Sequence, residues 1–309
     1  MALTPAMFEG HGVNLSATQR RAATLTTRRT VKKLHQAAWL LNAVRCIDLT
    51  TLSGDDTEGR VKRLCAKARS PLAQHLKEGL GIADMPLTTG AVCVYPTMVA
   101  HAVKALRGTD IPVASVATGF PTGLMPLKLR LEEIHYAVGE GAGEIDIVIT
   151  REHVLKNDWA ALYDEVAAMR EACGEAHLKA ILATGDLKTL RNVYAASMVA
   201  MQAGADFIKT STGKESVNAT LPVSLVMVRA LRDYGEMTGH RIGFKPAGGI
   251  KSAKEAVAWQ ILMKEELGRP WLEPDLFRFG ASSMLADIER QLEHHVTGRY
   301  AAFSRHALA

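Results

Sequence analysis

Short apolar runs alternate with longer amphipathic segments along most of the chain. The runs are rich in β-branched and other apolar residues, as buried parallel strands are. Eight such runs occur, at residues 45–52, 91–96, 112–121, 144–150, 177–185, 206–213, 241–249 and 276–283. Between them lie segments with apolar residues at helical spacing, for example residues 125–142. The pattern predicts eight strand–helix units.

Eight such units without a long break in composition predict a single (β/α)8 TIM barrel. Repeated strand–helix–strand units form parallel sheets, and a barrel of this kind takes about 250 residues. A doubly wound open sheet is the alternative. Polar residues within the runs or at their ends favour the barrel: Asp48, Thr118, Asp146, Lys209, Lys245 and Ser282. In a barrel these positions converge on one mouth, whereas an open sheet would spread them along an edge.

The barrel is expected to cover residues 45–290, preceded by a basic helical extension at 1–44 and followed by a tail at 291–309. The stretch TRRTVKKLHQAAWLLNAV (27–44) carries an apolar stripe at helical spacing. The stripe consists of Val31, Leu34 or His35, Ala38 and Leu41. An Arg-rich, acid-poor leader is also typical of a mitochondrial transit peptide, which is the alternative.

The formal net charge of +5 is concentrated in this extension. Six of the 37 Lys and Arg residues, but only one of the 32 acidic residues, lie within residues 1–35, so the rest of the chain is neutral. A neutral body does not indicate nucleic-acid binding. No apolar stretch approaches the roughly 18 residues of a membrane span, and no secretory signal is recognisable. We therefore expect a soluble, cytoplasmic protein with neither a nucleic-acid nor a membrane partner.

The cysteines and the common cofactor motifs give no sign of a metal or cofactor. Cys46, Cys65, Cys93 and Cys173 are scattered without CxxC or Cys/His spacing, so reduced thiols are expected. The HExxH, P-loop and GxGxxG patterns do not occur. The sequence predicts no cofactor and no metal site.

Two lysines stand inside apolar runs, Lys209 in DFIKTSTG and Lys245 in GFKPAGG. On neighbouring strands of a barrel their ammonium groups would approach each other in apolar surroundings. Burial and a nearby like charge both disfavour protonation, so one lysine should present the free amine that Schiff-base chemistry requires. Alternatively, either lysine pairs with a buried acid, Asp48 or Asp146, and only stabilises the barrel. Asp146 itself is either a lysine partner or a proton relay.

Glycine and hydroxyl residues follow the last three strands. Backbone N–H groups in such turns can hold a phosphate at the top of a barrel. The residues concerned are Gly213, Gly248, Gly249, Gly280, Ser282 and Ser283. A glycine pair alone usually marks a turn, but next to two lysines these positions indicate a small phosphorylated carbonyl compound as substrate.

Seven motifs occur in the order DLTTL, CVYP, EIDIVI, DFIKTSTGK, VNAT, GFKPAGGI and FRFGASS. This set resembles the deoxyribose-phosphate aldolase family over roughly residues 45–290. The amino-terminal helix and the ending DIERQLEHHVTGRYAAF look like the longer, animal-type branch. The resemblance implies a lyase of deoxynucleoside catabolism that needs no metal or organic cofactor. Its reaction is the reversible Schiff-base cleavage of 2-deoxyribose 5-phosphate to glyceraldehyde 3-phosphate and acetaldehyde.

The resemblance also implies roles for single residues. Lys209 would form the Schiff base, Lys245 would lower its pKa, and Asp146 would work with a water in proton transfer. The implied substrate contacts are Asp48, Cys93, Thr212 and Lys214. The implied phosphate contacts are Gly213, Gly248, Gly249, Ser282 and Ser283. Ala183 departs from bacterial members, which carry an acid there, so no role is transferred to it.

A small phosphorylated sugar is thus the expected partner, and a homodimer is left open. Another Schiff-base barrel enzyme, such as a transaldolase-like protein, would share one lysine but not the second lysine with these glycines. An inactive barrel that binds anionic partners through its basic extension is a further alternative. The intact lysine pair argues against this last function.

Overall fold

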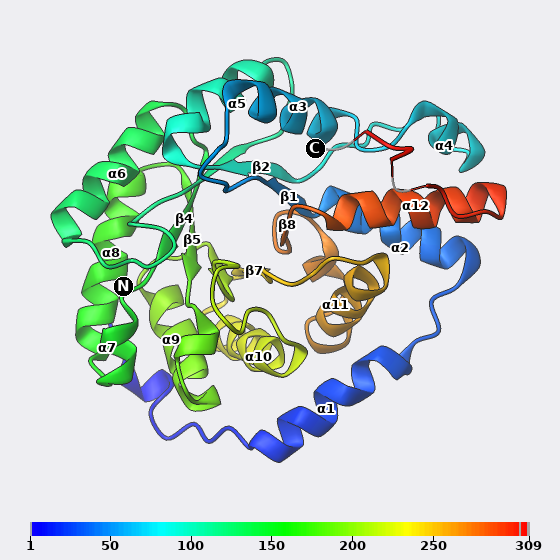
Figure 1. The fold of residues 1–309 in the computed structure, drawn as a ribbon. Coiled ribbons are helices and arrows are strands. Elements are labelled where there is room, and N and C mark those ends of the chain that lie inside the picture. Colours follow the sequence, from blue (N-terminus) through cyan, green and yellow to red (C-terminus); the bar gives the residue numbers. More distant parts are fainter. Residues whose placement is uncertain (1, 303, 308–309) are drawn as a thin grey trace.

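The computed structural model describes residues 2–302 and 304–307, in which strands and helices alternate (Figure 1). The strands are β1 (Ile47–Thr50), β2 (Ala91–Val94), β3 (Val113–Val116), β4 (Glu144–Val148), β5 (His177–Ile181), β6 (Phe207–Lys209), β7 (Gly243–Lys245) and β8 (Phe279–Ala281). The α-helices are α1 (Leu15–Arg28), α2 (Lys33–Arg45), α3 (Glu58–Arg69), α4 (Gln74–Gly79), α5 (Val99–Ala105), α6 (Leu127–Gly139), α7 (Arg151–Leu155), α8 (Trp159–Cys173), α9 (Leu190–Gln202), α10 (Leu221–Thr238), α11 (Ala253–Glu266) and α12 (Met284–Thr297). Short 3-10 helices are η1 (Pro5–Met7), η2 (Pro96–Met98), η3 (Thr184–Asp186) and η4 (Arg269–Leu272).

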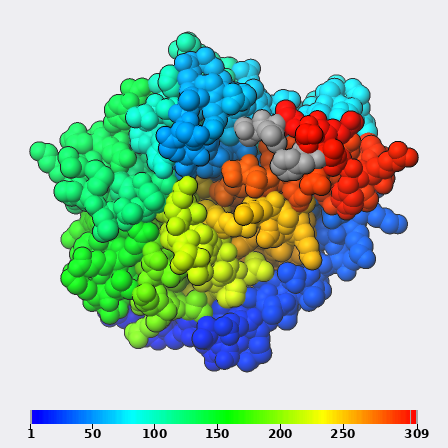
Figure 2. All heavy atoms as spheres, viewed as in Figure 1, coloured from blue at the N-terminus to red at the C-terminus, as the bar shows by residue number. Residues whose placement is uncertain are grey.

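The eight strands close into a barrel. All neighbouring strands are parallel, in the order β7-β6-β5-β4-β3-β2-β1-β8. Bridges from Phe244 to Phe277 and from Ala247 to Gly280 join β7 to the segment that carries β8, which completes the circle. Figure 2 shows the result on the surface, where orange and red carboxyl-terminal segments lie against blue and cyan ones. The predicted (β/α)8 barrel is confirmed and the open sheet is excluded.

Each predicted run contains a strand, but the strands are shorter than the runs. β6 ends at Lys209 and β7 at Lys245, whereas the corresponding runs continue to 213 and 249. The remaining residues form turns at the barrel mouth; Gly213, with a φ of 86°, cannot continue a strand. Thr118 was expected at this mouth, but its φ is 67° and its hydroxyl hydrogen-bonds to the backbone of Val148, so it links β3 to β4.

Side chains alternate between the barrel interior and the layer of helices. Ile145 and Ile147 of β4 and Ile208 of β6 belong to the apolar core. Asp146 and Lys209, one position away in the same strands, point to the opposite side because the side-chain period of a strand is two. The strand alternation therefore directs charged residues into the barrel interior.

Two helices precede the barrel where the sequence predicted one from residue 27. Extended backbone at Arg29 and Lys32 separates α1 from α2. α1 packs along α10 and α11, and α2 packs between α11 and α12 (Figure 1). Leu25 of α1 is fully buried, so this segment is packed as part of the folded chain.

The predicted apolar stripe of α2 is wrong by about one position. Leu34 is 75% exposed and Ala38 is also exposed, whereas Ala37, Leu40 and Val44 are buried. Both sets have helical spacing, and α2 buries the face that fits between α11 and α12. Packing against specific neighbours thus decided between two similar stripes.

Ion pairs attach the basic extension to the barrel. Arg21 lies 2.7 Å from Glu266 and Arg29 lies 2.6 Å from Glu265, both at the end of α11. Part of the positive charge is therefore paired within the chain. No helix in the described part of the chain is long and apolar enough to cross a membrane.

Candidate active site

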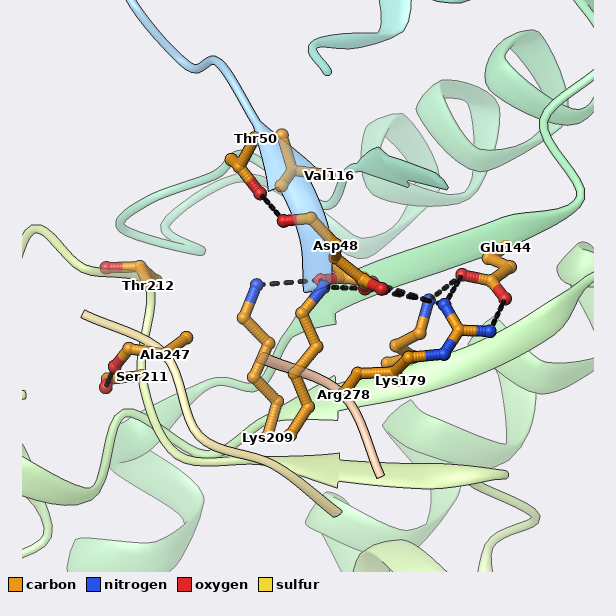
Figure 3. Close-up of polar contacts among 12 residues, drawn as sticks. Asp48, Thr50, Val116, Glu144, Lys179, Lys209, Ser211, Thr212, Ala247 and Arg278 are labelled. Carbon is orange, nitrogen blue, oxygen red and sulfur yellow. Dashed lines mark hydrogen bonds and ion pairs between the residues drawn. The ribbon is translucent and has the colours of Figure 1, made fainter. Parts of the chain in front are cut away.

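Lys209 and Lys245 lie side by side in the barrel. They are partners in the register between β6 and β7, and both are buried. Figure 3 shows the Lys209 side chain reaching into the interior, toward the group of charged side chains that includes Asp48. The prediction that the two lysines come from adjacent strands at the same height is confirmed.

Carboxylates bridge the lysines. Oδ2 of Asp146 lies 2.7 Å from Nζ of Lys209 and 2.7 Å from Nζ of Lys245. Lys245 also donates to Oδ2 of Asp48 at 2.5 Å. Both sequence-based interpretations of the lysines therefore apply in part, because the lysines are adjacent and also pair with the two candidate acids.

The surroundings separate the pKa values of the two lysines. Burial lowers the pKa of Lys209, and Lys245 lowers it further, which together outweigh the opposing effect of Asp146. Burial also acts to lower the pKa of Lys245, but Asp146 and Asp48 together raise it above its ordinary value. Lys245 has two carboxylate partners where Lys209 has one, so Lys209 gives up its proton more readily.

The carboxylates remain ionised despite burial. Burial alone would raise the pKa of Asp146, but Lys209, Lys245 and Lys179 hold it well below its usual range. Burial likewise opposes ionisation of Asp48, whose pKa is lowered by Lys245 and Arg278. The cluster around Lys209 is therefore ionic and stays so at neutral pH.

A second layer of charged residues lies beneath this cluster and was missed by the sequence analysis. Arg278 donates to Asp48 at 2.7 Å and to Glu144 at 3.0 Å, and Lys179 pairs with Glu144 (Figure 3). Lys179 also lies 3.3 Å from Oδ1 of Asp146, which accepts no hydrogen bond from a described residue. The sequence could have indicated that Glu144 belongs to this interior network, because it lies two residues before Asp146 and a strand directs both side chains to the same side.

The charges of the network balance only when one cation is neutral. Its cations are Lys179, Lys209, Lys245 and Arg278, and its anions are Asp48, Asp146 and Glu144. The pKa values of Lys179, Lys245 and Arg278 are raised, because their carboxylate partners outweigh burial. Only the pKa of Lys209 is lowered among these four, so a free amine at Lys209 is the state that makes the buried network neutral.

A cavity of about 320 Å³ opens above Lys209 at the carboxyl ends of the strands. Its lining comes from the segments after β1, β6, β7 and β8. It includes Thr50, Thr51, Leu52, Ser53, Lys209, Thr212, Gly213, Lys214, Ala247, Gly248, Gly249, Ile250, Lys251, Gly280, Ala281, Ser282 and Ser283. The predicted phosphate positions thus all meet in one cavity with Lys209, and Lys251 joins them as a residue that the sequence analysis missed.

The rim of this cavity combines hydrogen-bond donors and positive electrostatic potential, which suits an anion. The backbone N–H groups of Gly213, Gly248 and Gly249 hydrogen-bond to no other described residue. α12 begins immediately after Ser283, which brings the positive end of a helix to the same rim. Gly248 is required there, since its φ is 82° and a Cβ would lie 2.7 Å from Asn218.

Hydrogen bonds hold the loops after β6 and β7 together. Oγ of Ser211 donates to the carbonyl of Ala247 at 2.6 Å, and N–H of Ala247 donates to Oγ1 of Thr210 at 3.0 Å (Figure 3). Gly280 keeps space for this contact, because a Cβ there would lie 2.8 Å from Cβ of Ala247. The two glycine-containing loops therefore form one unit.

Asp48 and Cys93 do not belong to the described lining of the cavity. Asp48 lies below it in the charged network, and Cys93 packs with Ala114 and Val116 in a small apolar cluster. Burial raises the pKa of the Cys93 thiol.

Ala183 is fully buried with a φ of 53°. Within the described residues, no group of three or more His, Cys, Asp or Glu could hold a metal ion.

Comparisons with known proteins agree with this geometry. A model of the DeoC/LacD family of aldolases matches residues 43–286. The human deoxyribose-phosphate aldolase is 64% identical over 293 residues, which cover 94% of this chain and 92% of the human protein. The protein of that name from Bos taurus is 62% identical over the same shares of the two chains.

The fold has counterparts among solved structures. The deoxyribose phosphate aldolase of Aeropyrum pernix superposes with a TM-score of 0.60 and 24% identity, covering 91% of this chain and 99% of that one. This likeness supports the barrel fold. With the family model spanning all eight strands and two mammalian relatives above 60% identity, this chain belongs to the DeoC/LacD family of aldolases.

Proposed function

We propose that the protein is a deoxyribose-phosphate aldolase, a class I lyase that works through a Schiff base on Lys209. The observation that carries the proposal is the lowered pKa of Lys209 at the floor of a cavity whose rim offers unpaired N–H groups. A free amine supplies the nucleophile, and the rim supplies an anion site. The names of the mammalian relatives support 2-deoxyribose 5-phosphate as the substrate.

The reaction begins at Nζ of Lys209. The neutral amine adds to carbon 1 of the open-chain aldehyde, and loss of water gives a protonated imine, the iminium. Asp146 lies 2.7 Å from Nζ, close enough to exchange protons with this centre directly or through a water. Its Oδ1 atom retains acceptor capacity for such a water.

Bond cleavage follows from the electron demand of the iminium. A base removes the proton of the carbon 3 hydroxyl, the bond between carbons 2 and 3 breaks, and its electron pair moves to the iminium to form an enamine. Glyceraldehyde 3-phosphate leaves with carbons 3 to 5. Protonation of carbon 2 and hydrolysis then release acetaldehyde and restore the amine. Lys245 stays charged throughout and stabilises the ionised Asp146.

The cavity rim holds the other end of the substrate in this proposal. Gly213, Gly248 and Gly249 offer N–H groups, while Lys214 and Lys251 offer positive charge. The positive end of α12 adds to the attraction for a phosphate dianion. The arrangement fixes the phosphate at one end of the cavity and directs the aldehyde to Lys209 at the other.

Trapping with borohydride tests the proposal. Incubation with 2-deoxyribose 5-phosphate and borohydride should reduce the imine and add a substrate-derived mass to the peptide that contains Lys209. The Lys209→Arg variant should show neither the label nor release of glyceraldehyde 3-phosphate. The matched control is Lys156→Arg, whose exposed side chain pairs with Glu152 on the surface. A label on another lysine, or turnover by the Lys209 variant, contradicts the mechanism.

The proposal includes a cytoplasmic location and leaves room for a homodimer. The four cysteines are buried and free, as expected in a reducing compartment. Fractionation of cells tests the location, and light scattering on the purified protein measures the assembly.

A further inference from the structure

We propose that Glu215 is a positioning residue that gives the site its preference for a phosphorylated substrate. The inference rests on the proposed function, because it concerns how that site holds its phosphate. The loop between β6 and α10 brings Thr212, Gly213 and Lys214 to the cavity above Lys209. Glu215 is the next residue of the loop but lines a neighbouring cavity, on the other side of the same three-residue segment.

Glu215 fixes the conformation of that segment. Its side chain is only 3% exposed, and its two oxygens lie 3.1 and 3.0 Å from the N–H of Thr212. Oε2 also accepts the hydroxyl of Thr212 at 2.7 Å, and that hydroxyl accepts the N–H of Lys214 at 3.1 Å. Both donors of Thr212 are thereby bound within the loop, so Thr212 orders the loop rather than offering these groups to a substrate.

Gly213 is the group that this arrangement presents. It stands between two residues held by Glu215, directly or through the Thr212 hydroxyl, and its N–H hydrogen-bonds to no other described residue. The side-chain amide of Asn218 adds a further restraint by donating to the carbonyl of Glu215 at 3.0 Å. A phosphate that binds Gly213 therefore meets a preordered donor, which lowers the entropy cost of binding.

The charge of Glu215 needs an explanation, since a buried carboxylate near a phosphate site repels the ligand. Arg151 compensates for it: Nη2 of Arg151 lies 3.5 Å from Oε1 of Glu215, and its side chain is only 16% exposed. Arg151 also donates to the carbonyls of Pro121 and Thr122, and its Nε lies 3.2 Å from Asp186. It thus ties the loops after β3 and β5 to the loop that carries Gly213.

Two roles for Glu215 make different predictions. A residue that only stabilises the fold would affect all substrates alike when replaced. A residue that positions the phosphate donors would affect the KM of a phosphorylated substrate and leave an unphosphorylated one unchanged. Comparing 2-deoxyribose 5-phosphate with 2-deoxyribose separates the two.

The test compares wild type with Glu215→Gln and Glu215→Ala. Glutamine keeps the shape but replaces one oxygen with an NH2 group. At the position of Oε1 this group faces the N–H of Thr212 and Arg151, and at the position of Oε2 it faces both donors of Thr212, so donors oppose donors in either orientation. We expect KM for 2-deoxyribose 5-phosphate to rise about tenfold in Glu215→Gln, with kcat within about twofold. The kcat/KM for 2-deoxyribose should change by less than about twofold. Glu152→Gln is the control, since Glu152 lines the same neighbouring cavity but pairs with Lys156.

Binding of inorganic phosphate, followed by calorimetry, tests the inference without turnover. The affinity should fall about tenfold in Glu215→Gln and remain unchanged in Glu152→Gln. Equal effects on both substrates, or an unchanged phosphate affinity in a variant whose thermal unfolding is normal, would overturn the inference. A wild type that binds phosphate but cleaves no deoxyribose 5-phosphate would instead overturn the proposed function.

Discussion

Lys209 and Lys245 occupy paired positions of β6 and β7 and share a single oxygen of Asp146 at 2.7 Å each. Lys245 has Asp48 as a second carboxylate partner at 2.5 Å, whereas Lys209 has no second one among the described residues. The pKa of Lys245 is accordingly raised and that of Lys209 lowered, so Lys209 is the lysine that gives up its proton more readily. The number of carboxylates around each lysine thus favours Lys209 as the nucleophile of the proposed mechanism.

Replacing Lys245 with methionine should raise the pKa of Lys209. Loss of the like charge, and of the cation that shares Asp146 with Lys209, favours the protonated form of Lys209. Activity requires the free amine, so the rise of kcat/KM with pH should move to higher pH and the rate at neutral pH should fall at least about 100-fold. A pH profile between about pH 5 and 10 measures the shift. Lys156→Met should keep the wild-type profile; an unshifted profile in Lys245→Met contradicts this interpretation.

Arg278→Met should destabilise the fold. The substitution leaves Asp48 and Glu144 without the guanidinium that they share, and breaking such a buried pair costs about 3–5 kcal/mol. Urea unfolding followed by circular dichroism measures the loss. Arg45→Met is the matched control, because Arg45 pairs with Glu273 on the surface and should cost less than about 1 kcal/mol. Equal losses in the two variants would refute the special role of the buried pair.

Gly248→Ala should weaken substrate binding more than Gly249→Ala does. Both residues have a φ near 82°, so both substitutions strain the backbone by about 1 kcal/mol. At Gly248 the new Cβ would also collide with Asn218, at 2.7 Å, while at Gly249 it would meet no atom of a described residue within 4 Å. We expect KM for deoxyribose 5-phosphate to rise at least about tenfold in Gly248→Ala and only a few-fold in Gly249→Ala. Steady-state kinetics on both variants decide the order.

Leu40→Ala and Leu34→Ala should differ sharply in stability although both lie in α2. Leu40 is buried between α11 and α12, and its truncation should cost about 2–5 kcal/mol. Leu34 is largely exposed and should change stability by less than about 0.5 kcal/mol. Thermal and urea unfolding compare the two. A larger loss of stability in Leu34→Ala than in Leu40→Ala would contradict this prediction and favour the apolar stripe predicted from the sequence.

The sequence predicts the barrel well because its strands have strong patterns and converge geometrically. Lys209, Lys245 and Asp146 stand out as charged residues inside apolar strands, and the barrel closure that joins them is a general property of the fold. Arg278 and Glu144 escape notice because each looks like an ordinary residue at the start of a strand. Their role becomes visible only when strands distant in sequence supply their partners.

Two further features depend on tertiary contacts that no local pattern contains. The buried face of α2 follows from the shape of the gap between α11 and α12, since two stripes of similar spacing compete. Glu215 reads as a surface residue of a polar loop, and only the fold brings Arg151, at the start of α7, to its carboxylate. Loop residues behind a site are therefore the hardest class to find from sequence.

The charge balance of the interior has a consequence for the proposed catalytic cycle. With Lys209 as a free amine the buried network is neutral, whereas the iminium, as a protonated imine, adds one positive charge to it. Formation of the enamine discharges that nitrogen while the carbon–carbon bond breaks. The buried network therefore favours the cleavage step, and it is neutral again once the proton of the carbon 3 hydroxyl has passed to a base outside the network.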